Sequence, residues 1–310
     1  MAPSSLTTGM LTNLTNPLIT PAQLSTSGSQ LDGLPADLET SIRYAGCLLT
    51  QAAGILLRLP QDLIAQAIVI LQRFWAGAEG GSMRVYGTAD VSAACLYMMA
   101  KLSASSPLSP RIVINVYGFL LFSASPVFRQ GEGIIEKNQN PESYFVSDGE
   151  YYSRRAVLLK TEAHVLRVLG FQTHVALPHS LAINYLQALD TFGNKASSAA
   201  SAALAQRVFA HLNTALLSPQ LPLLTHQPPA LATAAIYLAA RELGIRLPDE
   251  EWWTVFDTER EELGFLVVGM RSMGGFAEAE RERWGKRSVP MSVEDVEDEL
   301  ATRRTLESGE

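Results

Sequence analysis

The sequence predicts an all-α protein made of two tandem bundles, each with five helices packed around a buried central helix. The segment Val91–Ala100 is apolar except for Ser92, and Leu231–Ala240 is apolar except for Thr233. A helix that is apolar on every side must be surrounded by protein or by lipid. Ten residues rise only about 15 Å, roughly half of a bilayer, so a protein interior is the expected surrounding.

The two central segments also belong to a repeated arrangement. Tyr237 follows Tyr97 by 140 residues, and Arg241 follows Lys101 by the same number. The preceding helices keep this offset, and the following helices depart from it by one residue. Agreement in the order and spacing of three elements predicts two helical units of similar layout. The alternative interpretation is a chance match between short alanine-rich helices.

The composition fits two packed domains and excludes several classes of function. The 310 residues are 47% hydrophobic, which is ample for two cores. A net charge of −7 argues against a nucleic-acid-binding surface. Cys47 and Cys95 lie in apolar helices, so we expect buried thiols and a reducing compartment. The sequence pattern predicts neither a signal peptide nor a membrane span.

Hydrophobic periodicity and helix-breaking residues define the helices in chain order. From Leu38 to Leu59, apolar residues recur at alternating steps of four and three, and Pro60 ends this first helix. The other helices expected in the first unit are Gln61–Trp75, Val91–Lys101, Pro110–Ser123 and Glu150–Leu169. In the second unit they are His179–Leu189, a helix ending near Leu217, Leu231–Arg241, Glu250–Phe256 and Leu263–Met273.

These helices divide the chain into four parts. Residues 1–34 are expected to be a disordered N-terminus and an extended arm lying on the first unit, because small and polar residues dominate them. The two units are predicted at residues 35–175 and 176–275, with a long surface loop over 124–149 in the first. Residues 276–310 are dense in charge and end acidic, which predicts a mobile or loosely helical tail.

Signatures of catalysis and metal binding are not found in the sequence. The glycines between Gly77 and Gly87 are not followed by the Lys and Ser/Thr of a phosphate-binding loop, so a linker is expected there. His174 and His179 have a spacing that no standard zinc motif uses. We therefore expect a protein that is not an enzyme and has no catalytic residues, metal or cofactor.

Two charged residues in apolar surroundings are the best candidates for a functional role. Glu162 shares a helical row with Leu158 and Val165, and a carboxylate in such a row is costly to bury unpaired. Lys101 ends an otherwise apolar helix. The two can form an ion pair within the unit, or Lys101 can extend to water. They can also face the surface of a partner, and these interpretations are compatible.

Several segments resemble the cyclins in their order along the chain, and the L-type cyclins in particular. AACLYMMAK and KTEAHVLRVLGF are two of the motifs. Trp252–Phe256 resembles a motif of the Q-type cyclins. The segments that carry the resemblance within Asn16–Met273 are Asn16–Ser25, Asp32–Pro35, Tyr44–Gln61, Ala67–Trp75, Ala93–Lys101, Arg111–Tyr117, Lys160–Leu189 and Ala234–Pro248.

This resemblance implies two successive five-helix cyclin boxes and a regulatory role. Cyclins bind a cyclin-dependent serine/threonine kinase and reposition its regulatory helix and activation segment. The L-type likeness implies a heterodimer with such a kinase in the nucleus, in RNA polymerase II transcription or pre-mRNA processing, without direct nucleic-acid or membrane contact. In the family a lysine and a glutamate grip the kinase, and Lys101 and Glu162 stand at the matching places. The implied kinase-binding residues are Met98, Lys101, Leu102, Glu162 and Leu166.

The chain also departs from the family pattern. Leu102 and Ser103 follow Lys101 where cyclins commonly have an acidic pair, and Gln72 stands where many carry an acid. Two other classes of protein remain open. One is a general transcription factor of the IIB kind, a double helical box that binds DNA, against which the acidic charge argues. The other is a kinase-independent scaffold with the same fold.

Overall fold

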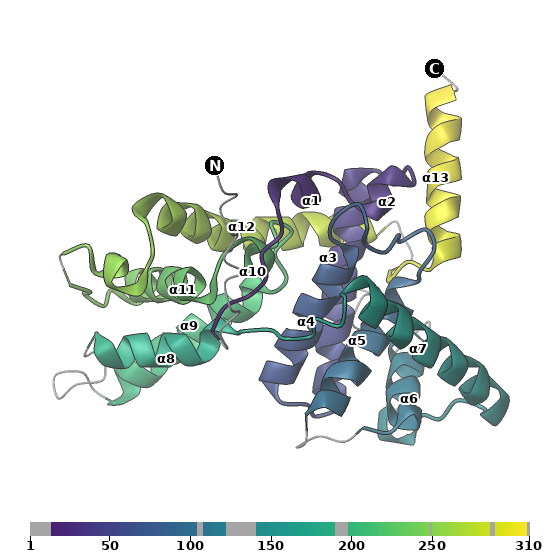
Figure 1. Ribbon diagram of the computed structural model, residues 1–310, viewed down its shortest axis with the longest axis horizontal. Coiled ribbons are helices and arrows are strands. Elements are labelled where there is room, and N and C mark those ends of the chain that lie inside the picture. Colours follow the sequence, from purple (N-terminus) through teal and green to yellow (C-terminus); the bar gives the residue numbers. More distant parts are fainter. Residues whose placement is uncertain are drawn as a thin grey trace, which may run out of the picture.

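The computed structural model of the chain describes residues 14–103, 108–121, 141–189, 198–248, 250–285 and 289–308. All regular structure in these residues is helical, as predicted (Figure 1). An N-terminal arm holds α1 (Pro21–Ser25) and α2 (Gly28–Leu31). The first unit contains α3 (Ala36–Leu56), α4 (Gln61–Trp75), α5 (Thr88–Leu102), α6 (Pro110–Leu121), η1 (Pro141–Ser143) and α7 (Asp148–Val168). The remaining helices are α8 (Pro178–Ala188), α9 (Ser198–Ala215), α10 (Pro222–Thr225), α11 (Pro228–Leu243), η2 (Trp252–Phe256), α12 (Arg260–Trp284) and α13 (Val293–Ser308). Residues 1–13 and most of the loop expected over 124–149 lie outside the described part.

The predicted central helix of the first unit is confirmed. α5 packs against α3, α4, α6 and α7, and every residue from Val91 to Ala100 is buried. The hydroxyl of Ser92, its one polar residue there, lies 2.6 Å from Thr50 Oγ1 and 2.6 Å from the Tyr117 hydroxyl. These hydrogen bonds remove the penalty of an unpaired hydroxyl in the core, so the apolar helix tolerates a serine.

The second unit has the same plan around α11, with one difference from prediction. α11 packs against α8, α9 and α12, and the hydroxyl of its buried Thr233 donates to the Pro229 carbonyl at 2.9 Å. The helix predicted over Glu250–Phe256 is instead the short 3-10 helix η2. Aromatic and β-branched residues fill this segment and are poor helix formers, and Asp257 takes a left-handed conformation that ends it.

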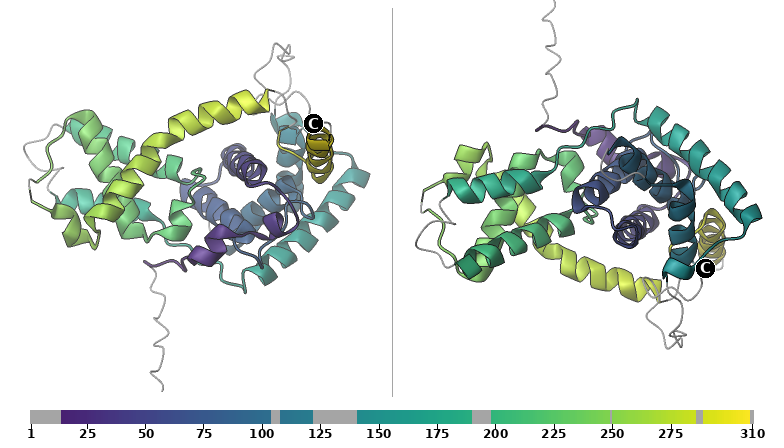
Figure 2. Two further views of the ribbon diagram at one scale, coloured as in Figure 1. Left: turned by 90° about the horizontal axis from the view of Figure 1, so that it is seen from above. Right: turned by 90° about the horizontal axis from the view of Figure 1, so that it is seen from below.

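α12 is longer than predicted and reaches back to the first unit. It continues past Met273 to Trp284, and Figure 2 shows it crossing from the second unit along the outside of the first. The rings of Phe276 and Trp284 pack on Tyr44 of α3, with centroid distances of 5.0 and 5.4 Å. Trp284 Nε1 also donates to Ser41 Oγ at 3.0 Å. The sequence predicted a tail beyond Met273 because those residues are dense in charge. Phe276 and Trp284 pack on α3, however, so the segment continues α12.

The C-terminal residues form a helix that docks on the first unit, in contrast to the expected mobile or loosely helical tail. Val296 and Leu300 of α13 are buried. Glu297 accepts two hydrogen bonds from Arg84, at 2.6 and 2.7 Å, and Arg303 donates two to Asp37, at 3.1 and 2.9 Å. Such bidentate pairs fix orientation as well as distance. Within the described residues, no helix has both the length and the apolar character that crossing a membrane requires.

The N-terminal arm contacts both units rather than the first alone. Asn16 is 3% exposed, and its side chain exchanges two hydrogen bonds of 2.8 Å with the backbone of Ala176, in the segment between α7 and α8. Its backbone exchanges two more with the Gln227 side chain, at 2.9 and 3.0 Å. Arg73 of α4 donates to Asn16 Oδ1 at 3.1 Å and to the His174 carbonyl at 2.6 Å. Three segments far apart in the chain therefore meet at one residue.

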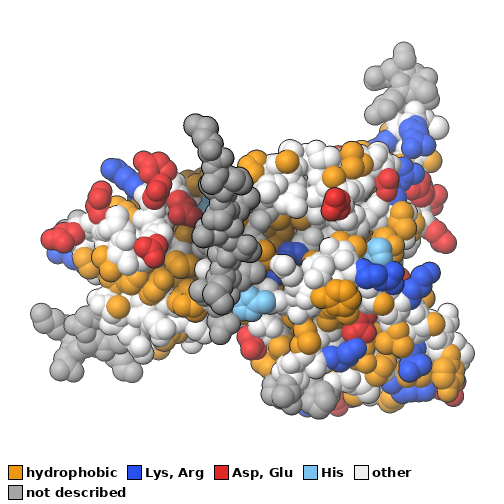
Figure 3. All heavy atoms as spheres, viewed as in Figure 1, with side chains coloured by type: hydrophobic (Ala, Val, Ile, Leu, Met, Phe, Trp, Pro, Cys, Tyr) orange, Lys and Arg blue, Asp and Glu red, His pale blue; other side chains and the backbone are white. Residues whose placement is uncertain are grey.

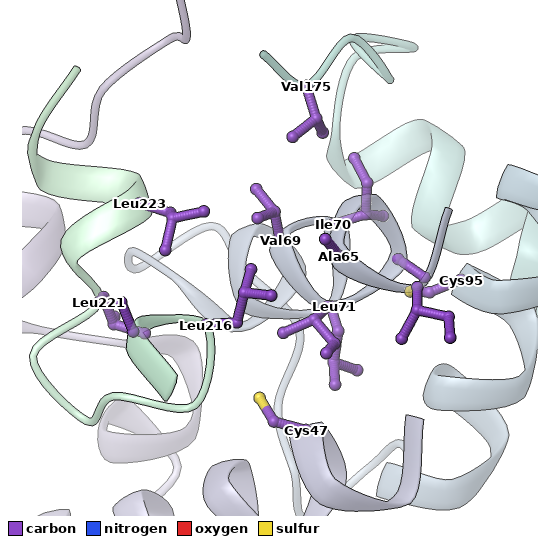
Figure 4. Close-up of a cluster of buried hydrophobic side chains, with 14 of the residues drawn as sticks. Cys47, Ala65, Val69, Ile70, Leu71, Cys95, Val175, Leu216, Leu221 and Leu223 are labelled. Carbon is purple, nitrogen blue, oxygen red and sulfur yellow. The ribbon is translucent and has the colours of Figure 1, made fainter. Parts of the chain in front are cut away.

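An apolar cluster joins the two units beside this point. Figure 4 shows Leu216, Leu221 and Leu223 of the second unit lying beside Val69 and Leu71 of α4. A buried polar contact between the units lies within this cluster. Gln72 is buried, and its Nε2 donates to the Leu216 carbonyl at 2.7 Å. A glutamine can make this bond because its amide is a donor, whereas an ionised acid would offer none.

Both cysteines should be unreactive while the protein is folded. Burial raises the pKa of the Cys47 thiol to about 12 and also raises the pKa of Cys95, so neither forms the reactive thiolate near neutral pH. We expect an aromatic disulfide reagent at pH 8 to label the native chain only as fast as it unfolds, and to label two thiols at once in denaturant. Rapid labelling of two thiols in the native chain would contradict this prediction.

Candidate partner-binding site

The last turn of α5 and the middle of α7 bring the two predicted charges together. Lys101 Nζ donates to Glu162 Oε1 at 2.6 Å. The Glu162 side chain is only 8% exposed, whereas that of Lys101 is 46% exposed. The carboxylate is thus held inside the unit by its partner, while the ammonium, which has three donors, keeps donors available at the surface. The ion pair predicted within the unit is present.

Local structure explains where the lysine lies. α5 ends at Leu102, and a cation in the last turn of a helix is favoured by the helix dipole. Lys101 Nζ also lies 4.9 Å from the centroid of the Tyr97 ring, one turn earlier. This cation–π contact and the Glu162 bond hold the ammonium from two sides. Sequence reasoning missed the role of Tyr97, although its spacing from Lys101 could have indicated it.

The apolar residues predicted at this site differ in exposure. Leu102 is 63% exposed, and Leu166 of α7 is partly buried. Met98 is only 2% exposed and therefore offers almost no surface, contrary to the expectation. It shares a helical row with Lys101, but neighbouring helices enclose α5 on every side up to Ala100. The structure thus places Lys101, Leu102, Glu162 and Leu166 around the end of α5, with Met98 beneath them.

Phe171, just beyond the C-terminal end of α7, is an exposed aromatic residue that sequence reasoning missed. It is 70% exposed and has φ of 61°, a left-handed conformation that is unusual for a bulky residue. Its amide donates to the Leu166 carbonyl at 2.9 Å, which ties the backbone of Phe171 to the last turn of α7. Backbone strain of this kind concentrates at binding sites. A glycine cap followed by an aromatic residue, Gly170-Phe171, was the available signal.

The site lies beside a positively charged helix face in an acidic protein. Between Tyr151 and Phe171 the one acidic residue is the buried Glu162, whereas Arg155, Lys160 and Arg167 are exposed. Figure 3 shows Lys and Arg side chains on the α7 side of the first unit, with Asp and Glu gathered at the far end of the second. A partner with a complementary, negatively charged rim would be attracted to this face.

The composition of this site is that of a binding surface. Among the described residues, no group of three His, Cys, Asp or Glu side chains could hold a metal ion. The Lys101–Glu162 pair is already satisfied internally, and the exposed Leu102 adjoins it. Apolar anchors beside a charged pair are the usual composition of a helix-docking surface.

Comparison with known proteins identifies the family. No family model matches the chain. Cyclin-L1 of Danio rerio is 35% identical over 254 residues, which cover 82% of this chain and 46% of that protein. Cyclin-L2 of Mus musculus is 34% identical over 259 residues, 83% of this chain and 45% of that protein. The chain therefore spans less than half the length of these relatives.

A solved structure gives the same fold. A chain of the yeast RNA Pol II CTD kinase CTDK-1 complex superposes with a TM-score of 0.63 at 12% identity, covering 94% of this chain and 84% of that chain. At this identity the likeness concerns the fold alone, and it agrees with two helical units around buried central helices. Together with the sequence relatives, the fold shows that this chain belongs to the cyclin family and is similar to the L-type cyclins.

Proposed function

We propose that the chain is the regulatory subunit of a cyclin-dependent serine/threonine kinase, which it binds as a heterodimer and activates. The observation that carries this proposal is the surface at the end of α5, where the exposed Leu102 adjoins the Lys101–Glu162 pair. Such a surface suits a partner helix whose apolar side chains pack on Leu102 and whose polar groups meet the charged pair.

The relatives support a process and a compartment for this role. Cyclin-L1 and Cyclin-L2 are similar over most of this chain, and a structural neighbour comes from a complex described as an RNA Pol II CTD kinase. These similarities support a role in RNA polymerase II transcription or pre-mRNA processing in the nucleus. The chain itself would carry no catalytic activity and would act by positioning the kinase.

We assign partner binding to the first box, residues 35–175, and a supporting role to the second, residues 176–275. Arg241 matches Lys101 by its position in the repeat and is exposed. The apolar run of α12 from Leu263 to Met270 carries no carboxylate to match Glu162. A single cation offers a partner one charged contact, whereas the first box offers a paired site with apolar anchors.

Recovery of a tagged chain from its native cells tests this function. We expect a cyclin-dependent kinase to copurify, and the purified complex to phosphorylate a serine/threonine substrate that neither subunit alone phosphorylates at a comparable rate. The purified chain alone should not consume ATP. Recovery of promoter DNA without a kinase would instead favour the IIB-like alternative, and recovery of neither would favour a kinase-independent scaffold.

A further inference from the structure

A cavity of about 630 Å³ separates the first box from the segment that leads into α13. Ala93 of α5, Ile114 of α6 and Leu158 of α7 line its apolar part, and residues 290–295 form another wall. Its volume lies in the range of about 300–1,000 Å³ that is common for ligand sites. Two segments that lie about two hundred residues apart in the chain therefore create a site-sized space that the proposed kinase contact does not use.

The charged groups around this cavity are predominantly acidic. Asp90, Glu294 and Asp295 line it, and Arg154 is the one cation that does so. Arg154 is already paired with Glu150, at 2.7 Å. Asp295 accepts a hydrogen bond from the Ser292 hydroxyl at 2.8 Å, where α13 begins. The cavity therefore has excess negative charge, which excludes anionic ligands.

Asp90 is the acid best placed to bind a ligand. No described residue forms a hydrogen bond or ion pair with its carboxylate, and its side chain is accessible to solvent. The surrounding protein nevertheless raises the pKa of Asp90 by desolvation, partly offset by Arg154. A carboxylate in the wall of a cavity is expected to be both accessible to solvent and partly desolvated, because protein surrounds it on most sides. An incoming cation would replace lost hydration there and interact more strongly than at a flat surface.

We propose that this cavity binds a basic side chain, lysine or arginine, of a partner polypeptide. The long aliphatic stem of such a side chain packs on apolar surface while its charged head reaches a carboxylate. Here the head would meet Asp90, and the stem with a neighbouring apolar side chain would lie against Ile114 and Leu158. The volume is larger than one side chain needs, which fits a peptide segment.

The cavity is formed before a ligand arrives. Its outer wall is held by the bidentate contact between Arg84 and Glu297 and by that between Arg303 and Asp37. Preorganisation of this kind reduces the entropy lost on binding. Asp90 and Lys101 are separated by eleven residues of α5, about 16 Å along the axis. A peptide in the cavity and a kinase at the end of α5 can therefore bind together.

Fluorescence anisotropy with the full chain tests the proposal. The probe is a labelled nonapeptide with one lysine between two leucines in a Gly/Ser background, and its matched control carries acetyl-lysine, which has no charge. We expect Asp90→Asn to weaken binding of the lysine peptide about fivefold or more, roughly 1 kcal/mol. The same variant should change binding of the acetyl-lysine peptide less than about twofold.

Asp62→Asn is the matched control variant, because Asp62 is also an exposed aspartate in the first turn of a helix, α4, and lies outside the cavity. It should leave the lysine peptide unaffected. An equal melting temperature for wild type and Asp90→Asn shows that both are folded. Equal binding of the two peptides, equal binding by Asp90→Asn, or no binding up to about 1 mM would each overturn the proposal. The proposal would also be overturned if hexylammonium bound as tightly as the lysine peptide, because the cavity would then be a site for small cations.

Discussion

Exchanging the two charges of the proposed partner-binding site, Lys101→Glu with Glu162→Lys, should leave the chain folded and weaken its affinity for the kinase by roughly 2–5 kcal/mol. The exchange preserves one acid and one base at the 2.6 Å contact, so the internal pair can form again. The exposed charge that faces the partner, however, changes sign. A group that attracted the partner's rim then repels it, which lowers affinity without removing apolar contact.

Calorimetry with the purified kinase measures this effect, and Arg241→Glu is its control. Arg241 is exposed at the repeat-related position of the second box, so its reversal should alter affinity by less than about 1 kcal/mol. All variants should share the melting temperature of the wild type to within a few degrees. Normal kinase binding by the folded double variant would place the partner site elsewhere. A larger loss of kinase affinity for Arg241→Glu than for Lys101→Glu would contradict the assignment of the partner site to the first box.

Asn16→Ala should destabilise the chain by about 2–6 kcal/mol. The substitution leaves the buried amide and carbonyl of Ala176 without their 2.8 Å partners, and each unsatisfied group costs about 1–3 kcal/mol. Arg73 also loses an acceptor in a site where burial lowers the pKa of its guanidinium to about 10. Because Arg73 belongs to the first box and Ala176 to the segment that leads into the second, the loss affects the association of the two boxes.

Denaturant unfolding of the full chain tests this prediction against Gln23→Ala. Gln23 belongs to the same arm, but its side chain accepts an exposed hydrogen bond from the Thr20 amide at 2.9 Å, so its removal should cost less than about 1 kcal/mol. If both substitutions lowered the free energy of unfolding equally, the Asn16 contacts would have no special part in holding the boxes together.

The helices were predictable because local chemistry defines them. The bounds of α4 coincide with the predicted Gln61–Trp75, since Pro60 starts the helix and a break in the apolar pattern ends it. The buried α5 and α11 were predictable for a related reason, because their sequences leave no polar face for water. Repeat spacing then gave their relation to one another. Patterns within single segments were sufficient to locate these helices.

The contacts between distant segments were not predictable in this way. Asn16 looks like an ordinary arm residue, because its partners lie 160 and 211 residues away. The end of α12 was interpreted as a charged tail, because the surface that covers Phe276 and Trp284 belongs to α3. Lys101 and Glu162 were identified because each conflicts with its own local pattern. Met98 was misplaced because exposure depends on the neighbouring helices.

The helix α12 has a consequence for how the molecule unfolds. Its first half packs on α11 within the second box, and its last turns cover Tyr44 in the first, so one continuous helix belongs to two cores. Helix formation is cooperative, and fraying at one end removes support from the next turn. Opening of either box therefore strains the other through a shared backbone. We therefore expect the two boxes to unfold as a single cooperative unit rather than as separable modules, with amide protons in both exchanging with solvent through a common opening.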